Sequence, residues 1–532
     1  MENKMSTYKR RGLTLIELLV ASTLGLMLVI GVMKAFQEIT RSVTRGRAVV
    51  KLSEDIRRTT NVLRSDLEGL TVKCIPNLAS NEDSGYFELI EGPKNDKNSI
   101  PLPNGLINDI TGDTDDILMF TSRRTGDFFS GRIQGYLLGS SEGYENLESP
   151  DAEIIYWLEL RNTDNGFDGR DNDGNDVVDE EQERLPLTHN GMPIGTLRRR
   201  ALLIRPNLNG PEGVLLRPNS SEPIKIALDS GGNPILNDLF LMNFINSNDL
   251  SIRLNADGTI SANSLADLTM RQNRVAHIPT GIINNEDPDK PNYKRDLNFP
   301  YPFTNARLPF QFGYFSSDDV LLEGVVGFDL RVFDPHVPIQ GVVELNPDTN
   351  APELIDALSP TDPGYNFSDN TRPVISYGAF SDLGWRRETG QIDYRQTDYL
   401  SGLPHPKSGL LLNRLPDENE EDYKFRLQNS LFIYDTWTQR YERDGINQDR
   451  DYYTDQDGDP LTDQEGNPLP LIDEGTNGLD DDGENGIDDP GESETPPPYN
   501  VPLRGIQVII RAFETGQQQL RQATVSHNFT SE

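Results

Sequence analysis

The feature that most constrains this chain is an apolar run near its start. Residues 13–33 read LTLIELLVASTLGLMLVIGVM and carry one charged side chain, Glu17. A helix rises about 1.5 Å per residue, so a run of this length spans the roughly 30 Å hydrocarbon core of a bilayer. The basic residues before the run favour a cytoplasmic N-terminus, namely Lys4, Lys9, Arg10 and Arg11. The sequence therefore predicts a single membrane-spanning helix with the rest of the chain on the far side.

The small residue that a processing enzyme would recognise lies before this run. A secretory signal has its small-residue cleavage site after the apolar region, whereas Gly12 precedes it here. A cut after Gly12 would leave the helix on the mature chain and create an amine on Leu13. A carboxylate inside a membrane helix costs a few kcal/mol unless it is paired, and the amine of a neighbouring subunit would supply that partner for Glu17. The alternative is an ordinary signal anchor with an incidental glutamate.

The stretch RGLTLIELLVA resembles the class III signal of type IV prepilins and type II secretion pseudopilins. The resemblance implies cleavage after Gly12 by a prepilin peptidase and N-methylation of the new terminus at Leu13. It also implies that Glu17 serves assembly into a filament with other minor and major pilins or pseudopilins. Most members of the family have phenylalanine where this chain has Leu13.

Helical spacing continues beyond the membrane run. Apolar residues recur at Val49, Leu52, Ile56, Leu63, Leu67 and Leu70, and charged residues such as Arg57 and Asp66 lie between them. No proline occurs before Pro76. The pattern predicts one helix over 13–70, roughly 87 Å long at the standard rise, whose second half packs on a globular domain.

Short strands follow the helix. Segments rich in β-branched and aromatic residues lie between turn residues at 86–90, 116–124, 132–138, 153–160, 196–205, 325–334, 502–513 and 520–529. The predicted fold class is therefore α+β, with a pilin-like long helix packed on antiparallel β-sheets that carry large loop insertions.

The order of these segments resembles the J-type minor pseudopilins of type II secretion and the W-type minor pilins of type IV pili. In both, the resemblance implies a subunit at or near the filament tip that primes assembly. The expected organisation is a leader at 1–12, a transmembrane segment at 13–34, the periplasmic half of the helix at 35–72, a β domain at 73–205 with an acidic loop at 164–183, an insertion at 206–310, further strands at 311–334, an acidic insertion at 335–500 and a terminal hairpin at 501–532.

Three acidic loops share one spacing of side-chain oxygens around a glycine. Their candidate ligands are Asp171, Asp173, Asn175 and Asp179; Asp455, Asp457, Asp459 and Asp463; and Asp480, Asp482, Glu484 and Asp488. Such loops wrap oxygens around a hard cation, and calcium takes about six to eight of them, so calcium is the expected cofactor. The loops depart from the EF-hand pattern because the glutamate at its last position is missing. The alternative is a solvated acidic linker, since Arg450 is the only base in residues 444–494.

Charge and motifs limit the functions that remain. The net charge of −36 argues against nucleic-acid binding, which needs a basic surface. The histidines lack metal-ligand spacing and the chain holds no recognisable catalytic motif, so no enzyme is expected. The preferred hypothesis is a minor pseudopilin or pilin that primes or caps a filament, anchored once in the inner membrane with its C-terminal domain in the periplasm. The alternative is a membrane-anchored, calcium-dependent adhesin or binding protein that uses the same signal.

Overall fold

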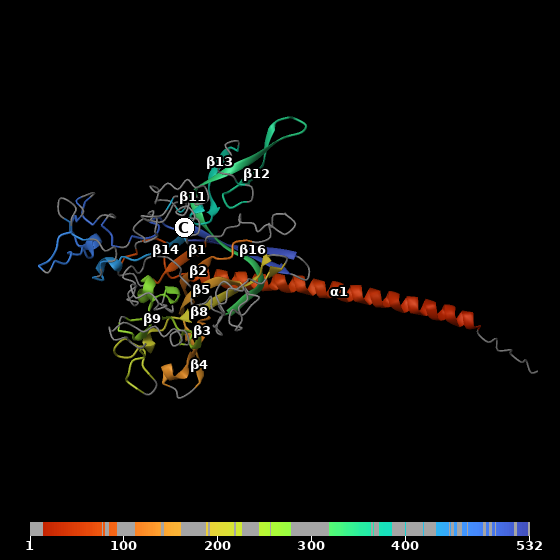
Figure 1. Ribbon diagram of the computed structural model, residues 1–532, viewed down its shortest axis with the longest axis horizontal. Helices are drawn as coiled ribbons and strands as arrows, with labels where there is room; N and C mark the ends of the chain where they lie inside the picture. Colours follow the sequence, from red (N-terminus) through yellow and green to blue (C-terminus); the bar gives the residue numbers. More distant parts are fainter. Residues whose placement is uncertain are drawn as a thin grey trace, which may run out of the picture.

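The structure is a computed structural model in which one long helix projects from a β-rich body (Figure 1). It describes residues 14–76, 78–79, 84–92, 112–139, 143–160, 188–189, 192–217, 220–225, 244–255, 257–277, 319–362, 365, 372–385, 400, 419, 432–445, 447, 452–454, 460–464, 466–481, 483, 486–488, 492–494, 496–514 and 519–529.

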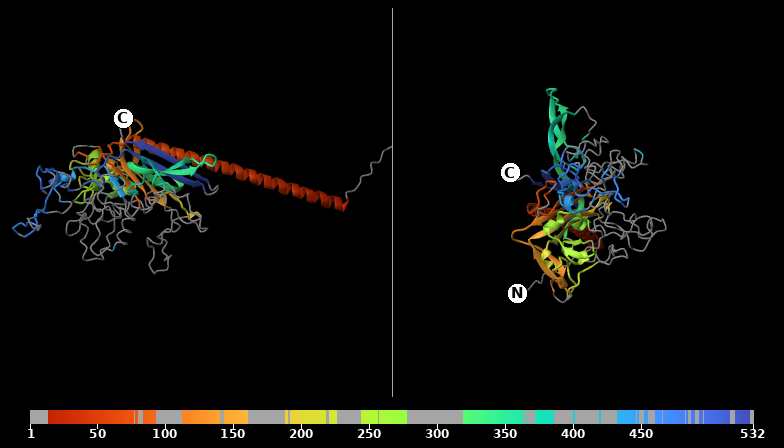
Figure 2. Two further views of the ribbon diagram at one scale, coloured as in Figure 1. Left: turned by 90° about the horizontal axis from the view of Figure 1, so that it is seen from above. Right: turned by 90° about the vertical axis from the view of Figure 1, so that its left-hand side faces the viewer.

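The long helix α1 spans Leu15–Glu68, which confirms the predicted continuous helix. Thr14 caps its start and Gly69 follows its last turn. The second half of the helix buries Leu52, Ile56, Leu63 and Leu67 in the core, as the apolar spacing predicts. Burial against the body therefore stabilises this half, whereas the first half projects away from the body (Figure 2).

The body is built on one antiparallel sheet. Its main path runs β14 (Phe432–Asp435), β1 (Phe87–Glu91), β2 (Ile117–Arg123), β5 (Asp151–Leu160), β8 (Gly195–Leu203), β11 (Asp319–Leu345), β15 (Gly505–Glu514) and β16 (Gln519–Asn528). Two further strands pair with β11, namely β12 (Pro352–Leu358) and β13 (Val374–Ser381). Helix and sheet together confirm the α+β class.

The two faces of this sheet bury different layers. Successive side chains of a strand point to opposite faces, and in β5 Ile154 and Tyr156 join the core that contains α1, whereas Ile155 and Trp157 join a second core. The second core contains β9 (Ile252–Leu254), β10 (Ile260–Ala262) and the short helix α3 (Leu265–Leu268). The sheet therefore lies between α1 and a lobe formed by residues 244–277.

Smaller elements complete the described part of the chain. These are the ribbons β3 (Phe129–Gln134) with β4 (Tyr144–Ser149) and β6 (Thr188–His189) with β7 (Met192–Pro193), and the 3-10 helices η1 (Gly135–Leu138), η3 (Pro206–Leu208), η4 (Arg271–Asn273), η5 (Val275–His277), η9 (Tyr441–Arg443) and η10 (Glu474–Thr476). The predicted strand 132–138 is wrong in its second half, because the chain turns at Gly135 into η1. Gly139 ends that turn in the left-handed conformation that glycine adopts easily.

One predicted segment boundary and one predicted insertion overlap with strands of the sheet. The boundary at 334/335 lies within β11, which continues past Pro335 and Pro338 to Leu345. A proline has no backbone N–H to donate to a neighbouring strand. The strand tolerates these prolines because the pairing of β11 with β13 shifts register between Asp334 and Pro338. Within the predicted insertion 335–500, β14 pairs with β1 and forms the edge of the sheet.

Candidate functional site: the exposed helix, its attachment and the acidic groups

The N-terminal turn of α1 contains Glu17, the predicted assembly residue. Its Oε2 accepts hydrogen bonds from the backbone N–H and the hydroxyl of Thr14, both at 2.9 Å. The Thr14 hydroxyl in turn accepts from the N–H of Glu17 at 3.3 Å. This reciprocal capping box stabilises the first turn. Gly12 and Leu13, the predicted processing residues, lie outside the described residues.

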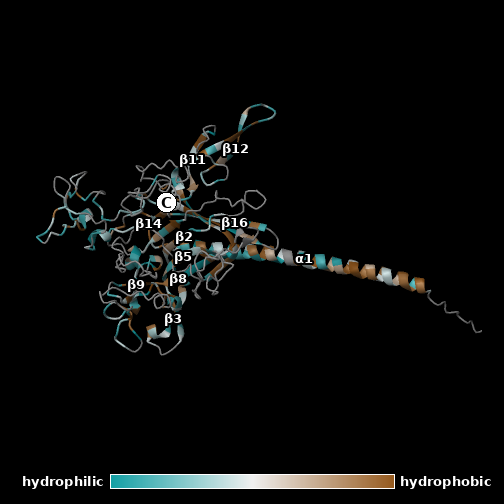
Figure 3. Ribbon diagram, in the orientation of Figure 1, coloured by the Kyte–Doolittle hydropathy of each residue, from teal (hydrophilic) through white to brown (hydrophobic). Residues whose placement is uncertain are grey.

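The first half of α1 exposes its apolar side chains. Residues such as Leu15, Leu24, Met27 and Met33 are exposed, and the most apolar window of the helix is not buried against any described part of the chain. This helix is long and apolar enough to cross a membrane. Figure 3 shows the same outer part of α1 as mostly hydrophobic. Such a surface is stable only in a bilayer or against the helices of other subunits.

A buried ionic group attaches the last turn of α1 to the sheet. The Asp66 carboxylate, which is completely buried, accepts hydrogen bonds from Arg199 Nε at 2.6 Å and from Arg124 Nη2 at 2.8 Å. The hydroxyl of Tyr156 donates to the same carboxylate at 2.6 Å. Ser122 Oγ donates to the Asp66 carbonyl at 2.8 Å. The helix is therefore held in one position on the sheet by directional bonds as well as by apolar packing.

The side chain of Asp66 does not lie on the charged, outer face of α1 where the helical pattern predicts it. The helical pattern places Asp66 among the charged positions between the buried leucines, yet its side chain points into the body. Burial alone would lower the pKa of Arg199. The neighbouring Asp66 carboxylate raises it, and the net result is that the pKa of Arg199 lies above its usual value. Arg199 thus stays charged and offsets the unfavourable position of a carboxylate at a helix C-terminus.

A second buried ionic group joins the lobe 244–277 to the sheet. Glu88 in β1 bonds Arg271 Nε at 3.1 Å, Arg274 Nη1 at 2.8 Å and His277 Nε2 at 2.9 Å. Arg274 also reaches Asp435 in β14 at 2.8 Å. Burial and the nearby Arg271 lower the pKa of His277 to about 4, so the arginines balance Glu88 at neutral pH. These hydrogen bonds and ion pairs hold the lobe 244–277 against the sheet.

The structure describes three of the twelve predicted calcium ligands, namely Asp463, Asp480 and Asp488. Asp463 accepts from the N–H of Asn467 at 2.8 Å. Asp488 has a positive φ of 50° and accepts from the N–H of Gly478 at 2.8 Å, which closes the third loop on itself. Asp480 and Asp488 are both exposed, and Glu484 lies outside the described residues.

The other predicted ligands also lie outside the described residues. They are Asp171, Asp173, Asn175, Asp179, Asp455, Asp457, Asp459 and Asp482. Calcium binding at the three loops therefore stays a prediction.

The structure brings together a different acidic group that the sequence analysis missed. Carboxylate oxygens of Glu91, Asp113 and Asp116 all lie within 4.8 Å of one another, and all three residues are buried. Asp116 accepts from the N–H of Gly92 at 3.1 Å and from the N–H of Leu330 at 2.7 Å, which fixes it between β1 and β11. The acid-rich stretch DTDD at 113–116, directly before β2, is the sequence signal for this group.

The electrostatics of this acidic group favour the binding of a proton or a cation. Burial, then the neighbouring carboxylates of Asp116 and Asp115, raise the pKa of Asp113 well above its usual range. Burial and Asp115 likewise raise the pKa of Asp116. Carboxylates so close together share protons or bind a hard cation such as calcium or magnesium. Because their pKa values are raised in the folded state, these groups reduce stability as the pH rises above about 4, where they ionise in the unfolded chain.

Comparison with known families concerns the N-terminal end alone. A family model described as the prokaryotic N-terminal methylation motif matches residues 7–33. No curated protein and no solved structure matches the chain. A motif of this type implies processing by a prepilin peptidase, assembly with other pilins and anchoring by a single N-terminal helix. It thus supports a pilin-type or pseudopilin-type subunit.

Proposed function

We propose that this chain is a minor subunit, J-type or W-type, that primes or caps a periplasm-spanning filament of a type II secretion or type IV pilus system. It has no catalytic activity of its own in this proposal. The C-terminal body lies in the periplasm while α1 is in the inner membrane, and it later becomes part of the filament.

The observation that carries the proposal is the match at 7–33 to the methylation motif, which overlaps the exposed first half of α1. The membrane covers this apolar half before assembly, and neighbouring helices would cover it afterwards. The size and number of the inserted segments support a subunit of low copy number, because a bulky body is easiest to accommodate at a filament end.

Mass spectrometry of the mature N-terminus tests the first step of this function. Protein from cells that contain the prepilin peptidase should begin at Leu13, with a methyl group on the new amine. Protein from cells that lack the peptidase should keep residues 1–12. An intact leader in both strains, or a cut beyond residue 33, would contradict a place in a filament system.

We also propose that calcium is the cofactor of the acidic loops and orders them after export. Two features of these loops support calcium binding: the shared spacing of their oxygen ligands, and the high negative charge that a cation would neutralise. Calcium at about 100 times its dissociation constant should stabilise the EDTA-treated full-length protein in detergent by about 2.7 kcal/mol. Thermal unfolding with and without calcium measures this effect.

Variants assign the calcium effect to the loops. Replacing Asp173 and Asp482 together with asparagine should reduce the calcium-dependent rise in melting temperature by at least half. Asp127→Asn, at an exposed acid outside the loops, is the matched control and should keep the full rise. A melting temperature that calcium does not change in the unaltered protein would contradict the assignment.

A further inference from the structure

A narrow β-arm projects from the body and has no role in the core. The end of β11 and the strand β12 form this arm, with β13 along its base (Figures 1 and 2). Its tip is a hydrogen-bonded turn, in which Asn346 Oδ1 accepts from the N–H of Asp348 at 2.9 Å and Asn350 adopts a positive φ of 55°. The arm is therefore a defined element of the fold.

One face of the arm is apolar and exposed. Val343 and Leu354 are cross-strand partners and are 43% and 56% exposed. Leu354 and Ile375 meet over Gly341, where an added Cβ would lie 2.8 Å from each side chain. Leu345, 62% exposed, extends this strip toward the tip. Exposed apolar strips of this kind on a projecting edge are typical of contact surfaces.

The same arm is acidic. Residues 338–358 contain Glu344, Asp348, Glu353 and Asp356 and no lysine or arginine. Glu344 and Glu353 are direct cross-strand partners, and like charges in that arrangement destabilise a sheet. A basic surface placed against the arm would remove this repulsion.

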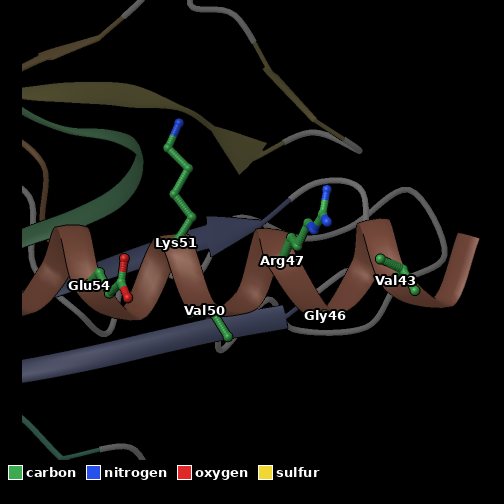
Figure 4. A pocket seen from close by; sticks show the side chains of 6 residues that line it. All are labelled: Val43, Gly46, Arg47, Val50, Lys51 and Glu54. Carbon is green, nitrogen blue, oxygen red and sulfur yellow. The ribbon is translucent and has the colours of Figure 1, made fainter. Parts of the chain in front are cut away.

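A surface with the complementary properties exists on α1. An open groove lies on the helix between its membrane half and its buried half, and its lining residues are Val43, Gly46, Arg47, Val50, Lys51 and one acid, Glu54. Val43 and Val50 are 49% and 56% exposed, and Gly46 leaves a gap in the helix surface. Arg47 and Lys51 extend from the same side of the helix (Figure 4). The only acid in residues 34–51 is Glu38, so this stretch is strongly basic.

We infer that the arm of one copy of this chain docks in the α1 groove of a second copy. The strip formed by Val343, Leu354 and Ile375 would cover Val43 and Val50. The long side chains of Arg47 and Lys51 would reach around the edge strand β12 to Glu353 and Asp356. The inference rests on the proposed function, since it assigns a contact between subunits of the filament.

Cross-linking between two differently tagged full-length copies in the same cells tests this contact. One copy carries Leu354→Cys and the other Val50→Cys, and a short bismaleimide joins the thiols; the native Cys74 is buried. The expected product is a dimer that carries both tags. Arg58→Cys in place of Val50→Cys is the matched control, because Arg58 is exposed on α1 outside the groove and should give at least tenfold less product.

Charge reversal separates specific docking from collision. Glu353→Lys with Asp356→Lys in the arm should lower the yield at least tenfold, and Arg47→Glu with Lys51→Glu in the other copy should restore it. These side chains are exposed, so the fold is not affected. A yield no higher than that of the Arg58 control, or a thiol at 354 that links only to other proteins, would overturn the inference. The N-terminus of the same sample is read separately, so a missing Leu13 start would contradict the filament function and not the contact.

Discussion

Replacing Asp66 with alanine should lower the free energy of unfolding of this protein by roughly 3–5 kcal/mol, the range found when one partner of a buried ion pair is removed. The change leaves Arg199 and Arg124 without the carboxylate that both contact, and Tyr156 without the acceptor of its hydroxyl. Within the described part of the chain, buried Arg199 would then keep one acidic partner, Asp319 at 3.0 Å. Urea unfolding of the full-length protein in detergent, followed by tryptophan fluorescence, measures the loss.

Two variants identify the cause of this loss. Asp66→Asn keeps an acceptor oxygen and should cost less than alanine. Asp55→Ala removes a half-buried acid from the same helix, where it pairs with the exposed Arg58 at 3.6 Å, and should cost less than about 1 kcal/mol. Equal losses for Asp66→Ala and Asp55→Ala would show that the buried group does not attach the helix to the sheet.

Replacing Glu17 with alanine should leave cleavage after Gly12 intact and reduce incorporation into filaments at least tenfold. The new amine on Leu13 would then enter an apolar helix bundle without an opposite charge, and each 1.4 kcal/mol of such a penalty is a factor of about ten in equilibrium. The loss of the cap on Thr14 adds roughly 1 kcal/mol at most to the cost of the first helical turn. Sheared filament fractions, compared with membrane fractions, measure incorporation.

The control for Glu17 is another glutamate of the same helix. Glu38 is exposed, lies beyond the apolar run and pairs with Arg41 at 3.2 Å. Glu38→Ala should therefore be incorporated normally. Normal incorporation of Glu17→Ala would contradict the neutralisation of the amine by Glu17, and a failure of cleavage would give Glu17 a role in processing instead.

Local patterns were sufficient to predict most of the secondary structure. The long helix, β2, β5, β8, β15 and β16 each carry a continuous apolar or alternating pattern, and the structure contains all of them near the predicted positions. The strands β12, β13 and β14 were not predicted, because they lie in segments rich in proline, aspartate and asparagine. Their pairing with β11 and β1 depends on strands far away in the chain, which no local pattern reveals.

The sequence by itself determined the membrane-length helix, the processing signal around Gly12 and the α+β class, because each follows from residues that are adjacent or regularly spaced. Only the tertiary structure decided that Asp66 is buried between two arginines, that Glu91 meets Asp113 and Asp116, and that an apolar, acidic arm projects from β11. These features join residues separated by many positions. Their energies come from burial and from charges brought close in space, and neither quantity is encoded in spacing along the chain.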